Sequence, residues 1–187
     1  TFEGLKVWYQ FGNRWNSPDF ASKRHTHQDF SNEIGKVNSA LQELNRMSLS
    51  HEEGILYVES KNLQKMLMPI MTNILEEIKA SLVATSRELC AKLQQELNAK
   101  VRVLNVEPNK LRDFAAFVDN LNKIKESSRE LMSQAEEVEK MHELAVRNKV
   151  GIATQDSVAL DHLRKLRDTF IAKVREADDL REDRILQ

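Results

Sequence analysis

The side chains best suited to metal chemistry are two groups of histidines. His142 followed by Glu143 begins the pattern in which two histidines one helical turn apart bind zinc and the glutamate acts as a base. The second histidine would have to stand where this chain has Val146. His25 and His27 form a spaced pair without a third ligand, which we interpret as the exposed start of a helix. The sequence therefore predicts no metal site, and His142 is expected at the wetter end of a helical bundle.

Catalytic and cofactor motifs are also missing from the sequence. A phosphate-binding loop needs closely spaced glycines, but the five glycines lie far apart, at positions 4, 12, 35, 54 and 151. Di-iron bundles place Glu-x-x-His sets on inward helix faces, where this chain has aliphatic residues. Nothing marks a nucleophile turn, although a Ser, His and Asp set assembled only by the fold would leave no such mark. We therefore expect no catalytic residue, no cofactor and no small-molecule substrate, and no enzyme in this segment.

The charges of the chain are balanced and well mixed. Its 28 basic and 29 acidic residues leave a net charge of −1, so no overall field draws it to nucleic acid or to an anionic membrane. A charged fraction of 30% suits the solvated faces of helices. No apolar run of membrane-spanning length, signal peptide or lipidation motif occurs in the sequence. Neither nucleic acid nor a membrane is an expected partner.

The single cysteine, Cys90, predicts a reduced compartment inside the cell, because it has no disulfide partner in this chain. The first residue is Thr1 and not Met, and the last residues keep a helical pattern. We therefore expect a segment of a longer protein.

Long helices are the elements that would position any site. Only Pro69 and Pro108 interrupt residues 60–148, which hold no glycine, so two helices with one reversal at Pro108 are predicted. After this reversal, apolar residues alternate steps of three and four, as in a heptad repeat. The heptad positions are Phe114, Phe117, Leu121, Ile124, Ser128, Leu131, Ala135, Val138, His142 and Ala145. Before it, a stripe with a period of about 3.7 residues argues against a long left-handed supercoil. That stripe consists of Leu63, Leu67, Ile70, Ile74, Ile78, Leu82, Leu89, Leu93, Leu97, Val101 and Leu104.

The fold class expected from these patterns is all-α: an elongated antiparallel helical bundle with long, partly heptad-patterned helices. A helix over residues 60–105 would be roughly 68 Å long, whereas a compact globule of this chain length is roughly 40 Å across. Residues 1–17 are expected to be the end of a preceding helical element, and residues 18–187 to form the bundle. Helices are predicted at about 22–47, 60–105, 108–148 and 156–184.

Local signals place the loops and helix ends. Residues 48–59 are predicted as a loop with a short extended run at 55–58, and Ser60 as the cap of the next helix. Pro69 is expected to kink that helix. Residues 149–154 form the second predicted loop, after which Thr154 or Asp156 can cap the last helix.

Trp8, Phe11 and Trp15 recur at helical spacing before Ser17 and Pro18, which are expected to end that helix. Both tryptophans then lie on one face. Packing against the bundle or against upstream chain is the favoured interpretation, and a pocket for a partner is the alternative.

The last two predicted helices should pair in antiparallel fashion, because a reversal centred on Ile152 brings Lys140 opposite Arg164. The acidic group Glu136, Glu137, Glu139 and Glu143 then faces the basic group Arg164, Lys165 and Arg167. Exposed ion pairs of this kind contribute about 0 to 1 kcal/mol each, so they set register more than stability.

The order of these features resembles a known family. A helix ending at Leu44-Asn45-Arg46-Met47 is followed by Gly54-Ile55-Leu56-Tyr57-Val58-Glu59-Ser60, and a long helix then runs to Leu104. Glu107-Pro108-Asn109-Lys110-Leu111 opens the next helix, which leads through Met141 and Leu144 to the loop before Asp156. This succession, over about residues 30–170, resembles the tail (stem) region of dynein heavy chains, and the axonemal members more than the cytoplasmic ones.

The resemblance implies a non-catalytic structural tail segment of a microtubule motor, which anchors the motor and transmits force in the ciliary axoneme. Its partners would be neighbouring dynein heavy, intermediate or light chains and axonemal docking proteins. The cell site would be the cytoskeleton, in the axoneme of a cilium or flagellum. The ATPase ring that the family implies would lie downstream of this chain.

Two other classes share coarse features with the chain. One is an interaction scaffold of the spectrin or coiled-coil kind, whose repeats would show a period that this sequence lacks. The other is a membrane-bending helical dimer, which needs a strongly basic face, and the densest basic cluster is residues 164–167.

Overall fold

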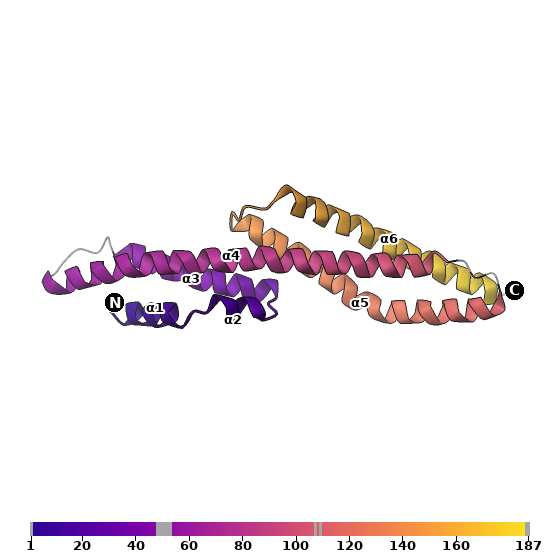
Figure 1. Ribbon diagram of the computed structural model, residues 1–187, viewed down its shortest axis with the longest axis horizontal. Coiled ribbons are helices and arrows are strands. Elements are labelled where there is room, and N and C mark those ends of the chain that lie inside the picture. Colours follow the sequence, from indigo (N-terminus) through magenta and orange to yellow (C-terminus); the bar gives the residue numbers. More distant parts are fainter. Residues whose placement is uncertain (1, 48–53, 107, 109, 186–187) are drawn as a thin grey trace. The chain divides into compact units, whose positions relative to one another are not determined.

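The computed structural model describes residues 2–47, 54–106, 108 and 110–185. In these ranges every regular element is an α-helix (Figure 1). The helices are α1 (Phe2–Arg14), α2 (Ser17–Ser22), α3 (His27–Met47), α4 (Gly54–Leu104), α5 (Leu111–Arg147) and α6 (Thr154–Ile185). The prediction of an all-α helical bundle is confirmed.

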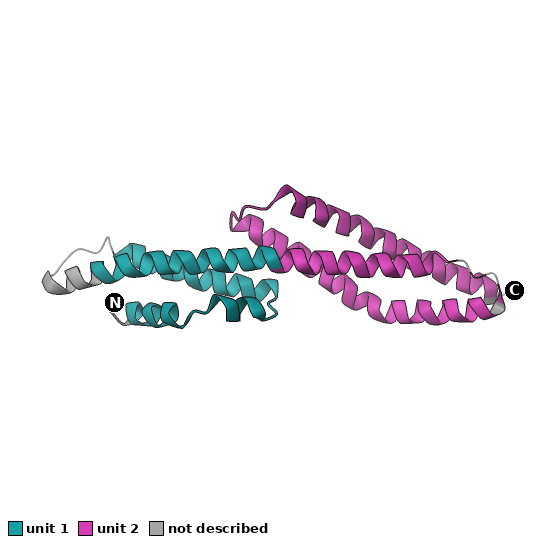
Figure 2. Ribbon diagram, viewed as in Figure 1, with its two compact units in different colours: residues 1–84 teal, residues 85–187 magenta. Residues whose placement is uncertain are grey.

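The chain divides into two compact units, Thr1–Ala84 and Thr85–Gln187 (Figure 2). The first unit contains α1, α2, α3 and the beginning of α4, and the second contains the rest of α4 with α5 and α6. The sequence patterns did not mark this division, because α4 has no glycine or proline near residue 84.

The long helix α4 begins earlier than predicted. It starts at Gly54, so residues 55–58 are helical and not extended, and Ser60 lies inside the helix and does not cap it. Strand propensity is a weak preference that a continuing helix overrides. The predicted loop at 48–59 is therefore wrong for residues 54–59, and residues 48–53 lie outside the described residues. The helix continues through Pro69, where the kink stays a prediction.

The predicted helix at 22–47 begins too early. A separate short helix, α2, precedes α3. Asn16 caps α2 by accepting a hydrogen bond from the amide of Asp19 at 3.0 Å, and Pro18 lies in the first turn of α2. α3 then begins at His27 and not near residue 22. α3 ends at Met47 as predicted, and the remaining predicted helix ends differ from the structure by one to three residues, with α5 beginning at Leu111.

The heptad pattern of α5 is confirmed as the face that lies in the core of the second unit. Phe117, Leu121 and Leu131 are buried, and Phe114 packs against the same core half-buried. The facing residues of α4 include Leu93 and Leu97. Those of α6 include Leu160, Leu163, Leu166 and Phe170. The second unit is thus three helices around one continuous apolar core.

The stripe predicted along α4 is mostly buried, with one error. Ile70 is 36% exposed, whereas its neighbour Met71 is fully buried. The spacing from Leu67 to Met71 to Ile74 puts methionine in the core, where its unbranched side chain fills irregular space. α1 packs closely beside this part of α4. A Cβ atom added at Gly12 would lie only 3.0 Å from Cγ2 of Ile70.

The antiparallel pairing of α5 with α6 is confirmed. Glu139 lies 2.9 Å from the guanidinium of Arg167 and 3.6 Å from that of Arg164. At the other end of the unit, Arg184 donates a 2.6 Å hydrogen bond to the carbonyl oxygen of Pro108 and lies over the ring of Phe114. These contacts fix the register of the two helices at both ends.

Candidate functional site

The histidines and the cysteine, the side chains best suited to metal chemistry, lie at different places in the chain. His142 is half-buried on α5, near the end of the helix. The imidazole of His25 stacks on the ring of Phe20, and its Nε2 lies 2.7 Å from the Phe20 carbonyl oxygen. Cys90 is buried in the core of the second unit, where burial raises the pKa of its thiol. Among the described residues, no three His, Cys, Asp or Glu side chains are grouped as metal ligands.

A row of aromatic rings is the most distinctive side-chain arrangement of the first unit. The ring centroids are 6.2 Å apart for Trp8 and Phe11, 6.0 Å for Phe11 and Trp15, and 5.0 Å for Trp15 and Phe20. Phe20 then contacts Phe30 edge to face at 5.8 Å. Such pairs add stability beyond the area that they bury. The row joins α1, α2 and α3.

The two tryptophans are held by hydrogen bonds to acidic side chains. The indole N–H of Trp8 donates to Glu43 on α3 at 2.6 Å, and that of Trp15 donates to Glu77 on α4 at 2.7 Å. Both indoles are half-buried. This placement agrees with the expectation that the tryptophans pack against the bundle.

An open cleft of about 440 Å³ lies along this row. Phe11, Trp15, Phe20 and His25 supply aromatic walls, and all four rings are half-buried. The volume falls in the lower part of the range for ligand pockets. The cleft was not predicted from the sequence, because α2 forms one of its sides and α2 was itself not predicted. Asn16 with Pro18 two residues later is the signal that could have found α2.

Four of the six Asp, Glu, Lys and Arg side chains that line the cleft form ion pairs. Lys23 contacts Asp19 at 2.6 Å, and Lys36 contacts Glu33 at 2.8 Å. Arg14 also lines the cleft and is exposed, and it has no ion pair within the described part of the chain.

Asp29, a further carboxylate of the cleft, is held by Thr26. The Thr26 amide and hydroxyl both donate to Asp29 at 2.8 Å, and these hydrogen bonds lower the pKa of Asp29. The Asp29 amide in turn donates to the Thr26 hydroxyl at 3.3 Å, which completes a capping box at the beginning of α3.

A second hollow, of about 370 Å³, lies in the second unit beside the reversal between α4 and α5. Its apolar walls come from Val103, Val106, Pro108 and Phe117. Val103 and Val106 are exposed. Asp113 and Asn120 are the polar side chains at its edge.

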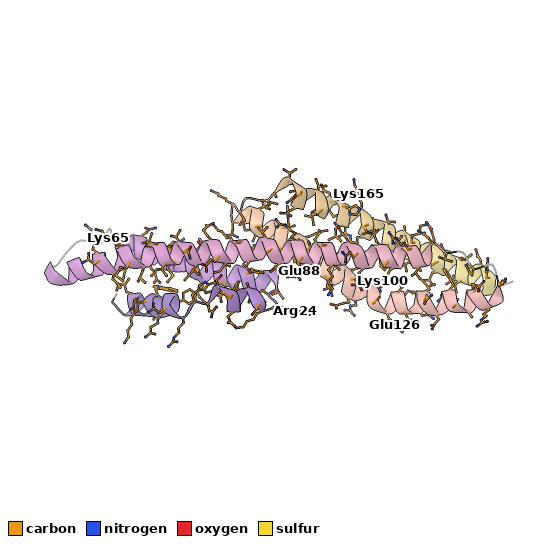
Figure 3. All side chains as sticks on the ribbon, viewed as in Figure 1. Arg24, Lys65, Glu88, Lys100, Glu126 and Lys165 are labelled. Atoms are coloured by element: carbon orange, nitrogen blue, oxygen red, sulfur yellow. The ribbon has the colours of Figure 1, made fainter. Side chains whose placement is uncertain are left out.

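α4 and α6 of the second unit are joined by a two-pronged ion pair. Arg87 donates from Nε to one oxygen of Asp156 and from a terminal nitrogen to the other, both at 2.8 Å. These hydrogen bonds lower the pKa of Asp156. Lys100 of α4, labelled in Figure 3, donates to the Ser127 hydroxyl of α5 at 3.1 Å. Polar contacts therefore link α4 to both other helices of the unit.

Replacing Asp156 with asparagine should weaken the acid dependence of stability. Because its pKa is lower in the folded state, Asp156 stabilises the fold above its unfolded pKa of about 3.9, and this stabilisation is lost as the pH falls through the folded pKa. We expect the variant to melt below the parent at pH 7, and its melting temperature to fall less between pH 7 and pH 3. Thermal unfolding by circular dichroism measures both.

The matched control is Asp179→Asn, because Asp179 is exposed on the same helix and has no ion pair within the described part of the chain. Its melting temperatures should follow those of the parent at both pH values. If Asp156→Asn also follows the parent, the ion pair with Arg87 contributes nothing to stability.

Comparison of the chain with models of protein families and with curated proteins gives no match. Among the described residues, no helix is both long and apolar enough to cross a membrane.

Proposed function

We propose that this chain is a non-catalytic segment of the tail of a dynein heavy chain, of the axonemal more than the cytoplasmic kind. The observation that carries the proposal is the reversal between α4 and α5. α4 ends at Leu104, Pro108 follows, and α5 begins at Leu111 with its heptad face buried. This reversal is one of the two features on which the family resemblance rests. The other, a short extended run after Gly54, is helical in the structure and does not support the resemblance.

The packing of the second unit suits a mechanical role. Each fully buried Leu or Phe contributes about 1.5 to 3 kcal/mol as an upper estimate. Buried residues of α4, α5 and α6, from Cys90 to Ala177, form one cluster in this unit. A core that is continuous along a bundle resists bending, because each turn is held by several side chains. The segment would anchor the motor on its doublet microtubule and carry load.

The partners would be neighbouring dynein heavy, intermediate or light chains and axonemal docking proteins. The surface supports protein partners more than nucleic acid or membrane, since the net charge is −1. Exposed basic residues such as Lys165 (Figure 3) lie beside acidic ones along α6. We propose no small-molecule substrate, cofactor or metal, and the cell site would be the axoneme of a cilium or flagellum.

Axoneme fractionation tests the proposal. The gene product that contains this chain is tagged in a ciliated cell, axonemes are isolated, and proteins are extracted with high salt. We expect the tagged protein in the axoneme, its release together with dynein subunits, and chemical crosslinks from Lys123 or Lys165 to those subunits. Absence from axonemes, or the lack of any dynein subunit among the crosslinked proteins, would contradict the proposal.

Vesicle co-sedimentation of the 187-residue chain distinguishes the proposed tail segment from a membrane-bending module. The tail segment should stay in the supernatant with vesicles that contain phosphatidylserine. Salt-sensitive sedimentation with these vesicles would favour a membrane-bending module instead.

A further inference from the structure

The cleft of the first unit has accessible aromatic surface and an arginine side chain to which the proposed tail function assigns no role. We propose that it is a docking site for a segment of a partner protein in which an acidic residue lies close to a large apolar side chain. The inference does not depend on the identity of the whole protein. It follows from the walls of the cleft and from the state of its charges.

The apolar part of the site is aromatic and already rigid. Trp15 is fixed by its bond to Glu77, so its polar edge is satisfied and the remaining ring surface is apolar. Phe20 is held between Trp15 and Phe30 at centroid distances of 5.0 and 5.8 Å. Rings that are held in place lose little conformational entropy when a partner packs on them. Aromatic residues and arginine are also the types enriched where binding energy is concentrated.

The cleft is lined by three basic and three acidic side chains, so its preference for an anion comes from hydrogen-bond donors that have no partner in the described part of the chain and not from net charge. Asp19 and Glu33 are neutralised by Lys23 and Lys36, and Asp29 is satisfied by two hydrogen bonds from Thr26. Arg14 is the charged group that remains unpaired within the described residues. Its planar guanidinium can hold a carboxylate through two parallel hydrogen bonds.

A protein segment fits these features better than an anionic membrane surface. Because acidic and basic side chains line the cleft in equal number, it gives a flat layer of anionic headgroups no net attraction. A single carboxylate needs only the hydrogen-bond donors of Arg14. The neighbouring rings then receive an apolar side chain, for which a cleft of about 440 Å³ has room.

Peptide selection on the intact 187-residue chain tests the proposal. A random library of twelve-residue peptides is selected on the chain and counter-selected on the Arg14→Glu variant. We expect enriched peptides in which Asp or Glu lies within about one helical turn of Leu, Ile, Phe or Trp. Enrichment of basic peptides, or no enrichment, would overturn the proposal.

The enriched peptide is then synthesised and its affinity measured by fluorescence anisotropy. Arg14→Glu should weaken binding by about tenfold or more, because a charge-assisted hydrogen bond becomes a repulsion. Arg14→Gln should give an intermediate loss. Replacing the apolar residue of the peptide with alanine should also weaken binding about tenfold, which tests the aromatic walls without changing the protein.

Arg46→Glu is the matched control, since Arg46 is exposed in the same unit and does not line the cleft. It should leave the affinity within about twofold of the parent, as expected for a screened charge away from the site. Equal losses in Arg46→Glu and Arg14→Glu would show that the peptide responds to net charge and not to the cleft.

Two further measurements test whether a second copy of the chain or a lipid occupies the cleft. Sedimentation velocity should give the same oligomeric state for the parent and Arg14→Glu, and a dimer that depends on Arg14 would assign the cleft to a second copy of the chain. Binding to phosphatidylserine vesicles that is lost in Arg14→Glu would assign it to lipid. Either result overturns the proposal.

Discussion

Replacing Phe117 with alanine should lower the free energy of unfolding of the second unit by about 3 to 5 kcal/mol. Phe117 is 6% exposed and lies in the apolar core that α4, α5 and α6 share. Its removal leaves a cavity that Leu121, one turn further along α5, cannot fill without moving the helix. Most of the cost comes from this cavity and from the lost transfer free energy of the ring.

Hydrogen exchange followed by mass spectrometry is the suitable measurement, because it reads peptides from residues 85–187 separately. Val158→Ala is the control, since Val158 is 62% exposed on α6 and should change stability by less than about 0.5 kcal/mol. A loss below about 1 kcal/mol for Phe117→Ala would show that the ring is not part of the core in solution.

Replacing Phe30 with alanine should destabilise the first unit by a similar amount, about 3 to 5 kcal/mol. Phe30 is fully buried on α3, where it contacts Phe20 edge to face and lies 5.4 Å from the ring of His25. The variant therefore loses both core packing and aromatic contacts. The end of the aromatic row that lines the cleft would also lose its support.

Tryptophan fluorescence during urea unfolding measures this effect directly. The chain has two tryptophans, Trp8 and Trp15, and both lie in the first unit. The midpoint should shift strongly in Phe30→Ala and remain near that of the parent in Val7→Ala, because Val7 is 57% exposed. If the two variants behave alike, the burial of Phe30 does not determine the stability of the unit.

The parts of the fold that could be predicted are those marked by a regularly repeated spacing of residues along the sequence. The heptad residues of α5 are spaced regularly over many turns, so the buried face could be read from Phe117 to Ala145. The pairing of α5 with α6 followed from opposite charges at matched distances from Ile152, and the contact of Glu139 with Arg164 confirms it. Such patterns predict structure reliably because every helical turn adds a residue to them.

Features that depend on a single turn were missed or misplaced. The beginning of α4 at Gly54 was placed six residues late, because residues 55–58 are of types with strand propensity, a weak preference that did not prevent the helix. The exchange of Ile70 for Met71 in the core is a local choice between neighbouring positions. Thr26 and Asp29 have the spacing of a capping box, which would have placed the beginning of α3 correctly.

The candidate site was predictable only in part. Trp8, Phe11 and Trp15 share one helix, so their common face follows from their spacing. Phe20 and His25 join them because the chain turns between α1 and α3, and no periodic pattern records such a turn. The unpaired state of Arg14 likewise depends on which neighbours the fold provides.

The contact between Arg184 and the Pro108 carbonyl has a consequence for biosynthesis. The two residues are 76 positions apart in the chain. At translation rates of about 5 to 20 residues per second, Arg184 leaves the ribosome roughly 4 to 15 seconds after Pro108. α5 itself ends at Arg147, so the completed hairpin of α4 and α5 waits roughly 2 to 7 seconds for Arg184, with the ring of Phe114 and the core face of Leu121 uncovered. Until α6 arrives, the nascent second unit therefore exposes apolar surface of the kind that chaperones bind.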